Sequence, residues 1–296
     1  MRLVFERKPH VYLPEISAYL RYVDERLPHV QAWDSGALDD YDPLDFDVVW
    51  RFMGLDIAGT GRRIIHEYNS LSTGRFARLK NRVKQTTNVR PDGRVFLNAA
   101  VRGGFWFPDA IPFRERDMGV ADSFFETGAP APVYDFVYAG SLDRGDTIVS
   151  ALEHFKTTLT DATFLVIGGV PDAIHERYGA VANIVFTGRV PCAAVPDLIA
   201  QARYGLNLMP DRYPFSLQTA TKVLEYCAAG LPVVSTDYRW IRKFERERGA
   251  RFFFLEKDWA NLTMAALERH PFQVPCVDDC AWNEVIARSG VFDLLG

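Results

Sequence analysis

The feature that most constrains the fold of this chain is the regular alternation of strands and helices after residue 134. The predicted strands are the short apolar runs at 136–139, 164–168, 184–188, 206–209, 233–236 and 251–255. Helical segments separate them, at roughly 147–159, 172–178, 195–201, 219–229, 238–247 and 258–268. Continuous apolar strands that alternate with helices are typical of strands buried on both faces. The pattern therefore predicts an α/β fold with a parallel, doubly wound sheet.

Glycine, polar and basic residues follow several of these predicted strands. Three of the loops begin with Gly140-Ser141, Gly168-Gly169 and Gly188-Arg189, and residues 210–216 follow a fourth strand. Ligands of doubly wound sheets bind beyond the carboxyl ends of the strands, where backbone N–H groups can bind phosphate. A tight turn explains any one glycine, but four such loops together indicate a site for a phosphate or a nucleotide.

Residues 214–236 predict a loop, a helix, a Gly-x-Pro turn and a buried strand. We expect Ser216 or Thr219 to cap the helix. Its N-terminus carries the positive end of the helix dipole, and Lys222 adds a full positive charge there, which suits a phosphate. The carboxylate of Glu225 lies close by in the sequence and can bind hydroxyls. The segment therefore predicts a ligand that carries both phosphate and sugar hydroxyls.

The same stretch resembles the donor-site helix of GT-B glycosyltransferases, in particular those of family 4. Lys222-x-x-Glu225-Tyr226 followed by the run GLPVV matches the motif that members commonly carry. Many members have a second Glu eight positions before the first, where this chain has Leu217. The resemblance implies two Rossmann-like domains that face each other across a cleft. We favour transfer with retention of the configuration of the sugar. Because of Leu217, however, the resemblance supports a nucleotide-sugar site more strongly than it supports retention.

The resemblance also implies roles for residues of the second domain. Glu225 would bind the ribose hydroxyls, and Lys222 and Arg144 would neutralise the diphosphate. Arg189 and Val190 would flank the base. The remaining donor contacts would come from Gly140, Ser141, Thr219, Ala220 and Thr221. Because fixed cations and a helix N-terminus can stabilise the leaving diphosphate, we expect neither a divalent metal nor another cofactor.

The expected domain boundary lies in the Pro- and Gly-rich segment 128–132. We expect residues 1–128 to form the acceptor-side domain and residues 133–280 to bind the nucleotide-sugar donor. By the resemblance, a helix over 281–296 that begins near Trp282 would cross back onto the first domain.

His66 stands near the end of a predicted strand in the first domain. The resemblance implies a His at this place that faces the acceptor, as a base or a binding group. The alternative is a strand histidine that is bonded to backbone.

Two Asp-x-Asp pairs, Asp40-x-Asp42 and Asp45-x-Asp47, resemble the metal-binding motif of GT-A glycosyltransferases. That motif normally ends a strand, whereas this acidic run precedes one. We therefore favour a solvated acidic loop.

A helix predicted over 75–85 places Phe76, Leu79 and Val83 on one face, which should meet the core or a bilayer. Its other face carries four basic residues, Arg75, Arg78, Arg82 and Lys84. A solvated face is the favoured explanation of these charges. The alternative is peripheral docking on an anionic membrane that carries a lipid-linked acceptor, with residues 105–107 as an apolar contact.

Composition limits the remaining classes of function. The formal net charge is −4 and neither half of the chain is strongly basic, so we expect no nucleic-acid partner. The N-terminus is too charged for a signal peptide, and no apolar run is long enough to cross a bilayer. We expect a cytoplasmic protein, with peripheral attachment at the inner face of the membrane as the alternative.

The chain has four cysteines, and two of them, Cys276 and Cys280, could form half a metal site with His270. We favour the simpler interpretation that these cysteines have no role in metal binding.

These observations predict a glycosyltransferase that moves a sugar from a nucleoside-diphosphate sugar to a glycan or a lipid-linked acceptor. Two alternatives stay open at this point. One is a GT-B-shaped epimerase or phosphorylase, and the other is a non-catalytic protein that binds nucleotide sugars.

Overall fold

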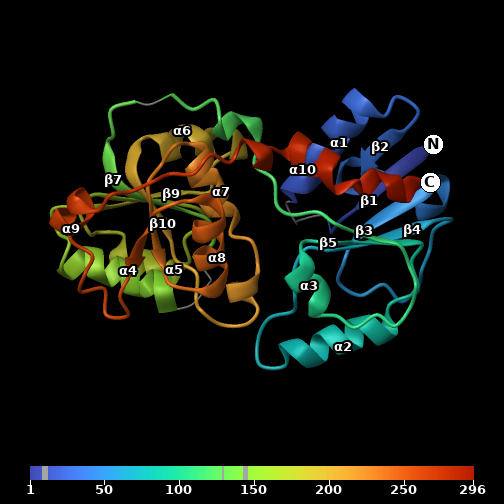
Figure 1. The fold of residues 1–296 in the computed structure, drawn as a ribbon, viewed down its shortest axis with the longest axis horizontal. Helices are drawn as coiled ribbons and strands as arrows, with labels where there is room; N and C mark the ends of the chain where they lie inside the picture. The colour runs from blue at the N-terminus through green and yellow to red at the C-terminus, as the bar shows by residue number, and fades with distance from the viewer. Residues whose placement is uncertain (9–12, 129, 143–145) are drawn as a thin grey trace. The chain divides into compact units, whose positions relative to one another are not determined.

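The computed structural model describes residues 1–8, 13–128, 130–142 and 146–296 (Figure 1). The chain divides into two compact units, each with its own six-stranded sheet. The first unit contains Met1–Gly119, Leu217–Thr219 and Asp279–Gly296. The second unit contains Val120–Ser216 and Ala220–Asp278.

The first unit is a parallel sheet with the strand order β2-β1-β3-β4-β5-β6. Its strands are β1 (Arg2–Glu6), β2 (Gln31–Asp34), β3 (Val48–Phe52), β4 (Ile64–Tyr68), β5 (Gly93–Phe96) and β6 (Phe113–Glu115). Its α-helices are α1 (Pro14–Arg26), α2 (Ala77–Thr87), α3 (Ala99–Gly103) and α10 (Trp282–Ser289). In Figure 1, α1 and α10 cover one face of this sheet, and α2 and α3 cover the other.

The second unit is a parallel sheet with the order β12-β11-β10-β7-β8-β9. Its strands are β7 (Tyr134–Ala139), β8 (Phe164–Ile167), β9 (Ile184–Gly188), β10 (Ala202–Asn207), β11 (Val233–Thr236) and β12 (Phe253–Leu255). Its α-helices are α4 (Asp146–Thr157), α5 (Asp172–Tyr178), α6 (Val195–Ala200), α7 (Thr221–Ala228), α8 (Arg239–Arg248) and α9 (Met264–Arg269). The predicted class, α/β with parallel Rossmann-like sheets, is confirmed.

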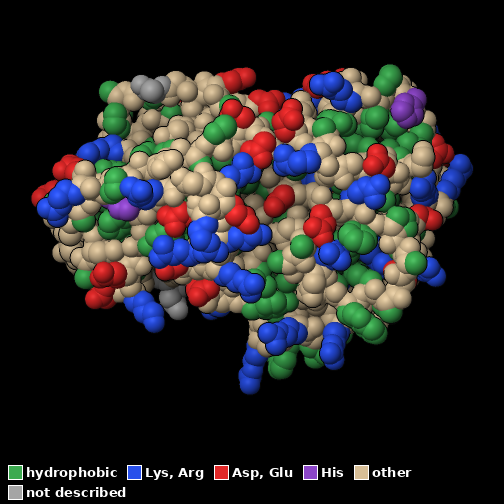
Figure 2. Space-filling view, viewed as in Figure 1, with side chains coloured by type: hydrophobic (Ala, Val, Ile, Leu, Met, Phe, Trp, Pro, Cys, Tyr) green, Lys and Arg blue, Asp and Glu red, His purple; other side chains and the backbone are tan. Residues whose placement is uncertain are grey.

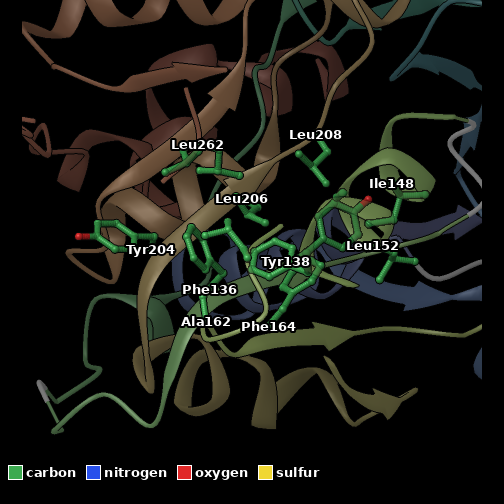
Figure 3. Close-up of a cluster of buried hydrophobic side chains, with 14 of the residues drawn as sticks. Phe136, Tyr138, Ile148, Leu152, Ala162, Phe164, Tyr204, Leu206, Leu208 and Leu262 are labelled. Atoms are coloured by element: carbon green, nitrogen blue, oxygen red, sulfur yellow. The ribbon is translucent and has the colours of Figure 1, made fainter. Parts of the chain in front are cut away.

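Alternate residues of the central strands build the core of the second unit (Figure 3). Side chains at every second position of a strand point to the same face of the sheet. Phe136 of β7 and Phe164 of β8 therefore both meet Phe155 of α4, with ring centroids 5.0 Å and 4.4 Å away. This apolar layer fixes α4 on one face of the sheet.

The core of the first unit contains a fully buried ion pair between Arg116 and Glu67 of β4. The Trp50 indole nitrogen donates to Glu67 Oε2 at 2.7 Å, and Arg116 Nε donates to the Tyr19 hydroxyl at 2.8 Å. Burying two charges costs free energy, which only close pairing and further hydrogen bonds can offset. The Tyr19 hydroxyl also donates to Glu67 Oε2 at 3.2 Å, so Arg116 and Tyr19 together join β4 to α1.

The C-terminal segment packs on α1, as the resemblance predicted. Trp282 is buried in the core of the first unit, together with Ile286 and Leu294. The helix α10 ends at Gly290, whose φ of 59° is left-handed, and a short 3₁₀ helix (Val291–Leu295) follows. The prediction of a Trp-started terminal helix on the first domain is confirmed.

Several predicted boundaries differ from the structure. The strand expected at 206–209 is β10 over Ala202–Asn207, and the helix expected at 258–268 is the shorter α9. The elements α3 and β6 were missed altogether. Non-apolar residues explain two of these misses, since the unpredicted start of β10 contains Arg203 and Gly205 and the three-residue β6 contains Arg114 and Glu115.

We expect Arg116→Met to lower the free energy of unfolding by about 3–5 kcal/mol, because it leaves the buried Glu67 carboxylate without a counterion. Urea denaturation at neutral pH measures this loss. Adding Glu67→Gln should restore part of it, since a neutral amide can still accept from Trp50. A double variant that is no more stable than Arg116→Met would contradict this explanation.

Candidate functional site

The strand order of the second sheet places its ligand-binding crevice between β7 and β10. Successive strands β7, β8 and β9 extend to one side, while β10, β11 and β12 extend to the other. Doubly wound sheets bind ligands at this reversal point, beyond the carboxyl ends of the strands. The turn at Gly140 directly follows β7, and the segment after β10 leads into α7. Predicted site residues from distant parts of the sequence thus meet at one edge.

Gly140 and Lys222 are in close contact at this edge. A Cβ atom built on Gly140 would lie 2.6 Å from Lys222 Cε, so the lysine chain crosses the turn where Gly140 has no side chain. The φ of Gly140 is 141°, a conformation that side chains other than glycine rarely adopt. Beyond this contact, Lys222 Nζ lies 5.1 Å from the ring centroid of Tyr138. The glycine and the aromatic ring together fix where the ammonium group sits.

The predicted cap of α7 is wrong. The N-cap is Ala220, whose side chain makes no capping hydrogen bond. Thr219 instead donates to Asp117 Oδ1 at 2.5 Å and belongs to the first unit. Without a capping side chain, the first backbone N–H groups of α7 have no intrahelical acceptor. Such a helix end, at Ala220 and Thr221, is suited to an anion.

Tyr226 holds α7 on the strands, a role that the sequence analysis missed. The backbone N–H of Ala139 donates to its hydroxyl at 3.1 Å, and that hydroxyl donates toward the Leu206 carbonyl at 3.3 Å. One side chain thus bridges β7 and β10 at the reversal point. Because Tyr226 follows Lys222 by four residues, the two lie on the same face of α7. This spacing of four residues was the signal in the sequence that could have pointed to Tyr226.

Glu225 is a partly buried carboxyl group in the second turn of α7. Burial raises its pKa to about 7, while the nearby Lys222 ammonium opposes that rise. A carboxyl group whose pKa is displaced by burial beside a specific cation is typical of functional sites.

Arg189 and Val190 follow β9 at the same edge of the second sheet. A Cβ atom on Gly169 would lie 3.0 Å from Arg189 Nε, so the arginine chain lies over that glycine. Arg189 is exposed and Val190 is partly buried. Ser141 is exposed directly after Gly140, and the predicted Arg144 lies outside the described residues.

His66 lies in β4 of the first unit, with a side chain that is fully buried. Its Nε2 is 3.0 Å from Asp56 Oδ2, and Asp56 also accepts from Arg51 at 2.7 Å. Burial lowers the pKa of His66 below its usual value. This environment matches the alternative interpretation, in which His66 is a structural histidine of the strand. Its hydrogen-bond partner is a carboxylate, however, and not the backbone.

The acidic run before β3 serves local structure. Asp42 accepts from the backbone N–H of Leu44 at 2.9 Å, and Asp47 accepts from that of Arg2 at 2.8 Å. Within residues 1–8, 13–128, 130–142 and 146–296, no three His, Cys, Asp or Glu side chains are grouped so as to hold a metal ion. Over the same residues, no helix has both the length and the apolarity needed to cross a membrane.

The second unit has the strand order of a doubly wound, nucleotide-binding type of domain, and comparison with known proteins identifies the class of protein. Residues 134–269 match the family model described as "Glycosyl transferases group 1". The protein is a glycosyltransferase with the GT-B fold, and the predicted resemblance is confirmed.

Solved structures with this fold span nearly the whole chain. AviGT4, "a glycosyltransferase involved in Avilamycin A biosynthesis", has 16% identity and a TM-score of 0.58, with 99% of this chain and 94% of that one covered. Alr3699/HepE from Anabaena "in complex with UDP-glucose" has 12% identity, a TM-score of 0.60 and 99% and 97% coverage. The UDP-GlcNAc 2-epimerase from Methanocaldococcus jannaschii has 10% identity, a TM-score of 0.53 and 98% and 99% coverage. No curated protein sequence matches the chain.

The raised pKa of Glu225 predicts a pH-dependent stability. Its carboxyl group has a pKa of about 7 when folded, against 4.5 as the ordinary value. The charged form therefore penalises the folded state above pH 7, and this penalty disappears as the pH falls toward 4.5. We expect Glu225→Gln to be more stable than wild type by about 1–3 kcal/mol near pH 8 and equally stable near pH 5.

Urea denaturation at the two pH values tests this expectation. Glu256→Gln supplies the matched control, because Glu256 is exposed and its carboxyl group stays hydrated. A Glu225→Gln variant that is less stable than wild type near pH 8 would contradict the assigned burial penalty.

Proposed function

We propose that this glycosyltransferase transfers a sugar from a UDP-sugar to a glycan or a lipid-linked acceptor. The contact of Lys222 with Gly140, at the reversal point of the second sheet, carries the proposal. The Lys222 ammonium group and the uncapped N-terminus of α7 both lie at the edge of the sheet where doubly wound folds bind nucleotides.

Each donor group then has a matching residue at this edge. The diphosphate would bind Lys222, the backbone N–H groups of Ala220 and Thr221, and Arg144. Glu225 would accept hydrogen bonds from the ribose hydroxyls, since an ionised carboxylate is a strong acceptor. Arg189 and Val190 would flank the base, and HepE, which has the same fold, is described in complex with UDP-glucose. Gly140, Ser141 and Thr219 complete the proposed set.

The chemistry follows from where negative charge develops. As the glycosidic bond breaks, the departing diphosphate gains charge, and prearranged cations stabilise it more in the transition state than in the ground state. Lys222 is positioned before the reaction, because Gly140 and Tyr138 hold its chain and its ammonium group. A divalent metal is not needed for this role, and metal-independent transfer is part of the proposal.

The first unit is proposed to bind the acceptor. His66 stays a prediction as the acceptor-side base, and its burial argues against that role, because a base must come within hydrogen-bond reach of the acceptor hydroxyl. Retention of configuration also stays a prediction, and Leu217 stands where many relatives have a carboxylate.

Product analysis with UDP-sugars tests the proposed reaction. We expect UDP release that depends on an added acceptor and persists in EDTA. Release of a free epimer would favour the epimerase alternative, whose fold this chain shares. Loss of all turnover in EDTA, with recovery on adding Mn²⁺, would contradict the metal-independent chemistry. Glu225→Ala should weaken UDP binding by roughly ten- to a hundred-fold, because it removes hydrogen bonds to a charged group.

We further expect Gly140→Ala to weaken UDP binding by about tenfold or more, since the added Cβ would lie 2.6 Å from Lys222 Cε and displace the ammonium group. Gly230→Ala is the matched control. Gly230 also has a positive φ, of 69°, but no atom lies within 4 Å of the added Cβ. Both variants strain the backbone, so equal losses of UDP affinity, measured by calorimetry, would contradict the specific role of the lysine contact.

A further inference from the structure

The helix α2 turns its apolar stripe away from the core. Phe76, Leu79 and Val83 are 60%, 58% and 43% exposed, whereas Ala77 and Asn81 form the buried face. Of the two environments expected for this stripe, the protein core is excluded. Exposing three large apolar side chains on one face does not stabilise the unit itself, so this face calls for another explanation.

Two other segments extend this apolar surface. Leu55 and Ile57, in the loop after β3, are 60% and 71% exposed. The loop is fixed beside the end of α2, because the Asp56 N–H donates to Asn88 Oδ1 at 2.9 Å and the Val89 N–H donates to the Asp56 carbonyl at 2.8 Å. Leu55, Leu79 and Val83 line one shallow cavity of about 570 Å³.

Trp106 adds a third exposed segment, at 72%. Its backbone N–H donates to Gln85 Oε1 of α2 at 2.9 Å, so the tryptophan is held beside the helix. Phe105, which was expected to share this contact, is instead buried against Tyr68. We call Phe76, Leu79, Val83, Leu55, Ile57 and Trp106 the apolar patch.

The segment that contains α2 is rich in basic residues. Between Glu67 and Asp92 the chain has six basic residues and no acidic one, although its net charge is −4. They are Arg75, Arg78, Lys80, Arg82, Lys84 and Arg90. Figure 2 shows blue and green side chains gathered together where Figure 1 places α2.

The basic residues flank the stripe on both sides. Successive helix residues are about 100° apart around the axis. Lys80 and Lys84 therefore fall on one side of the apolar stripe, and Arg78 and Arg82 fall on the other, while Arg75 lies in the turn before the helix. This is the arrangement of a helix that lies flat in a lipid interface, with its apolar face among the acyl chains and its cations at the headgroups.

We propose that α2 and the adjoining apolar patch dock the protein on the surface of an anionic lipid bilayer. A second copy of this face would bring two cationic surfaces together, and a polyanion such as nucleic acid would leave the apolar patch unused. A bilayer with anionic headgroups satisfies both features at once. The inference goes beyond the proposed transfer reaction and does not depend on it. If a lipid-linked acceptor is the substrate, docking would bring the enzyme to it.

Sedimentation with vesicles tests the proposal without any sugar substrate. Wild-type protein should sediment with phosphatidylglycerol-containing vesicles at low salt, and much less with pure phosphatidylcholine vesicles. Each basic residue contributes about a fivefold increase in binding, which salt reduces. Wild-type protein that stays in the supernatant with anionic vesicles at low salt would overturn the proposal.

Two variants separate the contributions of charge and apolar contact. Reversal of four exposed charges, Arg75→Glu, Arg78→Glu, Lys80→Glu and Arg82→Glu, should abolish sedimentation. Its control reverses four exposed charges elsewhere, Arg26→Glu, Lys243→Glu, Arg246→Glu and Arg269→Glu, and should bind as wild type does. Equal losses in the two variants would show an effect of net charge alone and would overturn the proposal.

The apolar variant is Phe76→Ser with Leu79→Ser and Val83→Ser, and it should lose most of the binding that survives at physiological salt. Its control replaces exposed apolar residues elsewhere, Leu44→Ser, Val133→Ser and Val185→Ser. Circular dichroism and the urea midpoint verify that every variant is folded. An apolar variant that binds anionic vesicles as tightly as wild type would indicate a general polyanion surface and would also overturn the proposal.

Discussion

The contact between Gly140 and Lys222 is the constraint on which the candidate donor site depends. Lys222 reaches the carboxyl edge of the second sheet only because the turn after β7 has no side chain at Gly140. Tyr226, one helical turn further along α7, holds that helix to β7 and β10 through one hydroxyl. Position and charge are thereby fixed before any ligand binds, which is how a site stabilises charge without reorganising during the reaction.

Buried charge organises the first unit in a different way. Arg116 and Glu67 lie on one face of the sheet, and His66, Asp56 and Arg51 lie on the other, since neighbouring residues of β4 point to opposite faces. Each cluster satisfies its charges internally. That explains why a histidine placed for acceptor chemistry by resemblance is fully buried here, bonded to a carboxylate.

The two units also differ in what they offer to partners. In the second, the exposed Arg189 follows β9, and the N-terminus of α7, near the partly buried Glu225, follows β10, both at the carboxyl edge of the sheet. The first offers an outward surface on α2, where exposed apolar side chains lie among basic ones. A soluble donor would be recognised by the edge and a surface-bound acceptor by the helix, if both proposals hold.

The sequence by itself determined the α/β class, the elements of the second unit and the helix with Lys222 and Glu225, because apolar periodicity and the Gly-x-Pro stop are local signals. Strand order was decided only by tertiary structure, and with it the reversal point between β7 and β10 where Gly140 meets Lys222. The sequence also could not predict that the apolar stripe of α2 faces outward, that His66 is buried or that Thr219 does not cap α7. Periodicity shows that residues share a face, but only packing decides whether that face meets the core, a partner or water.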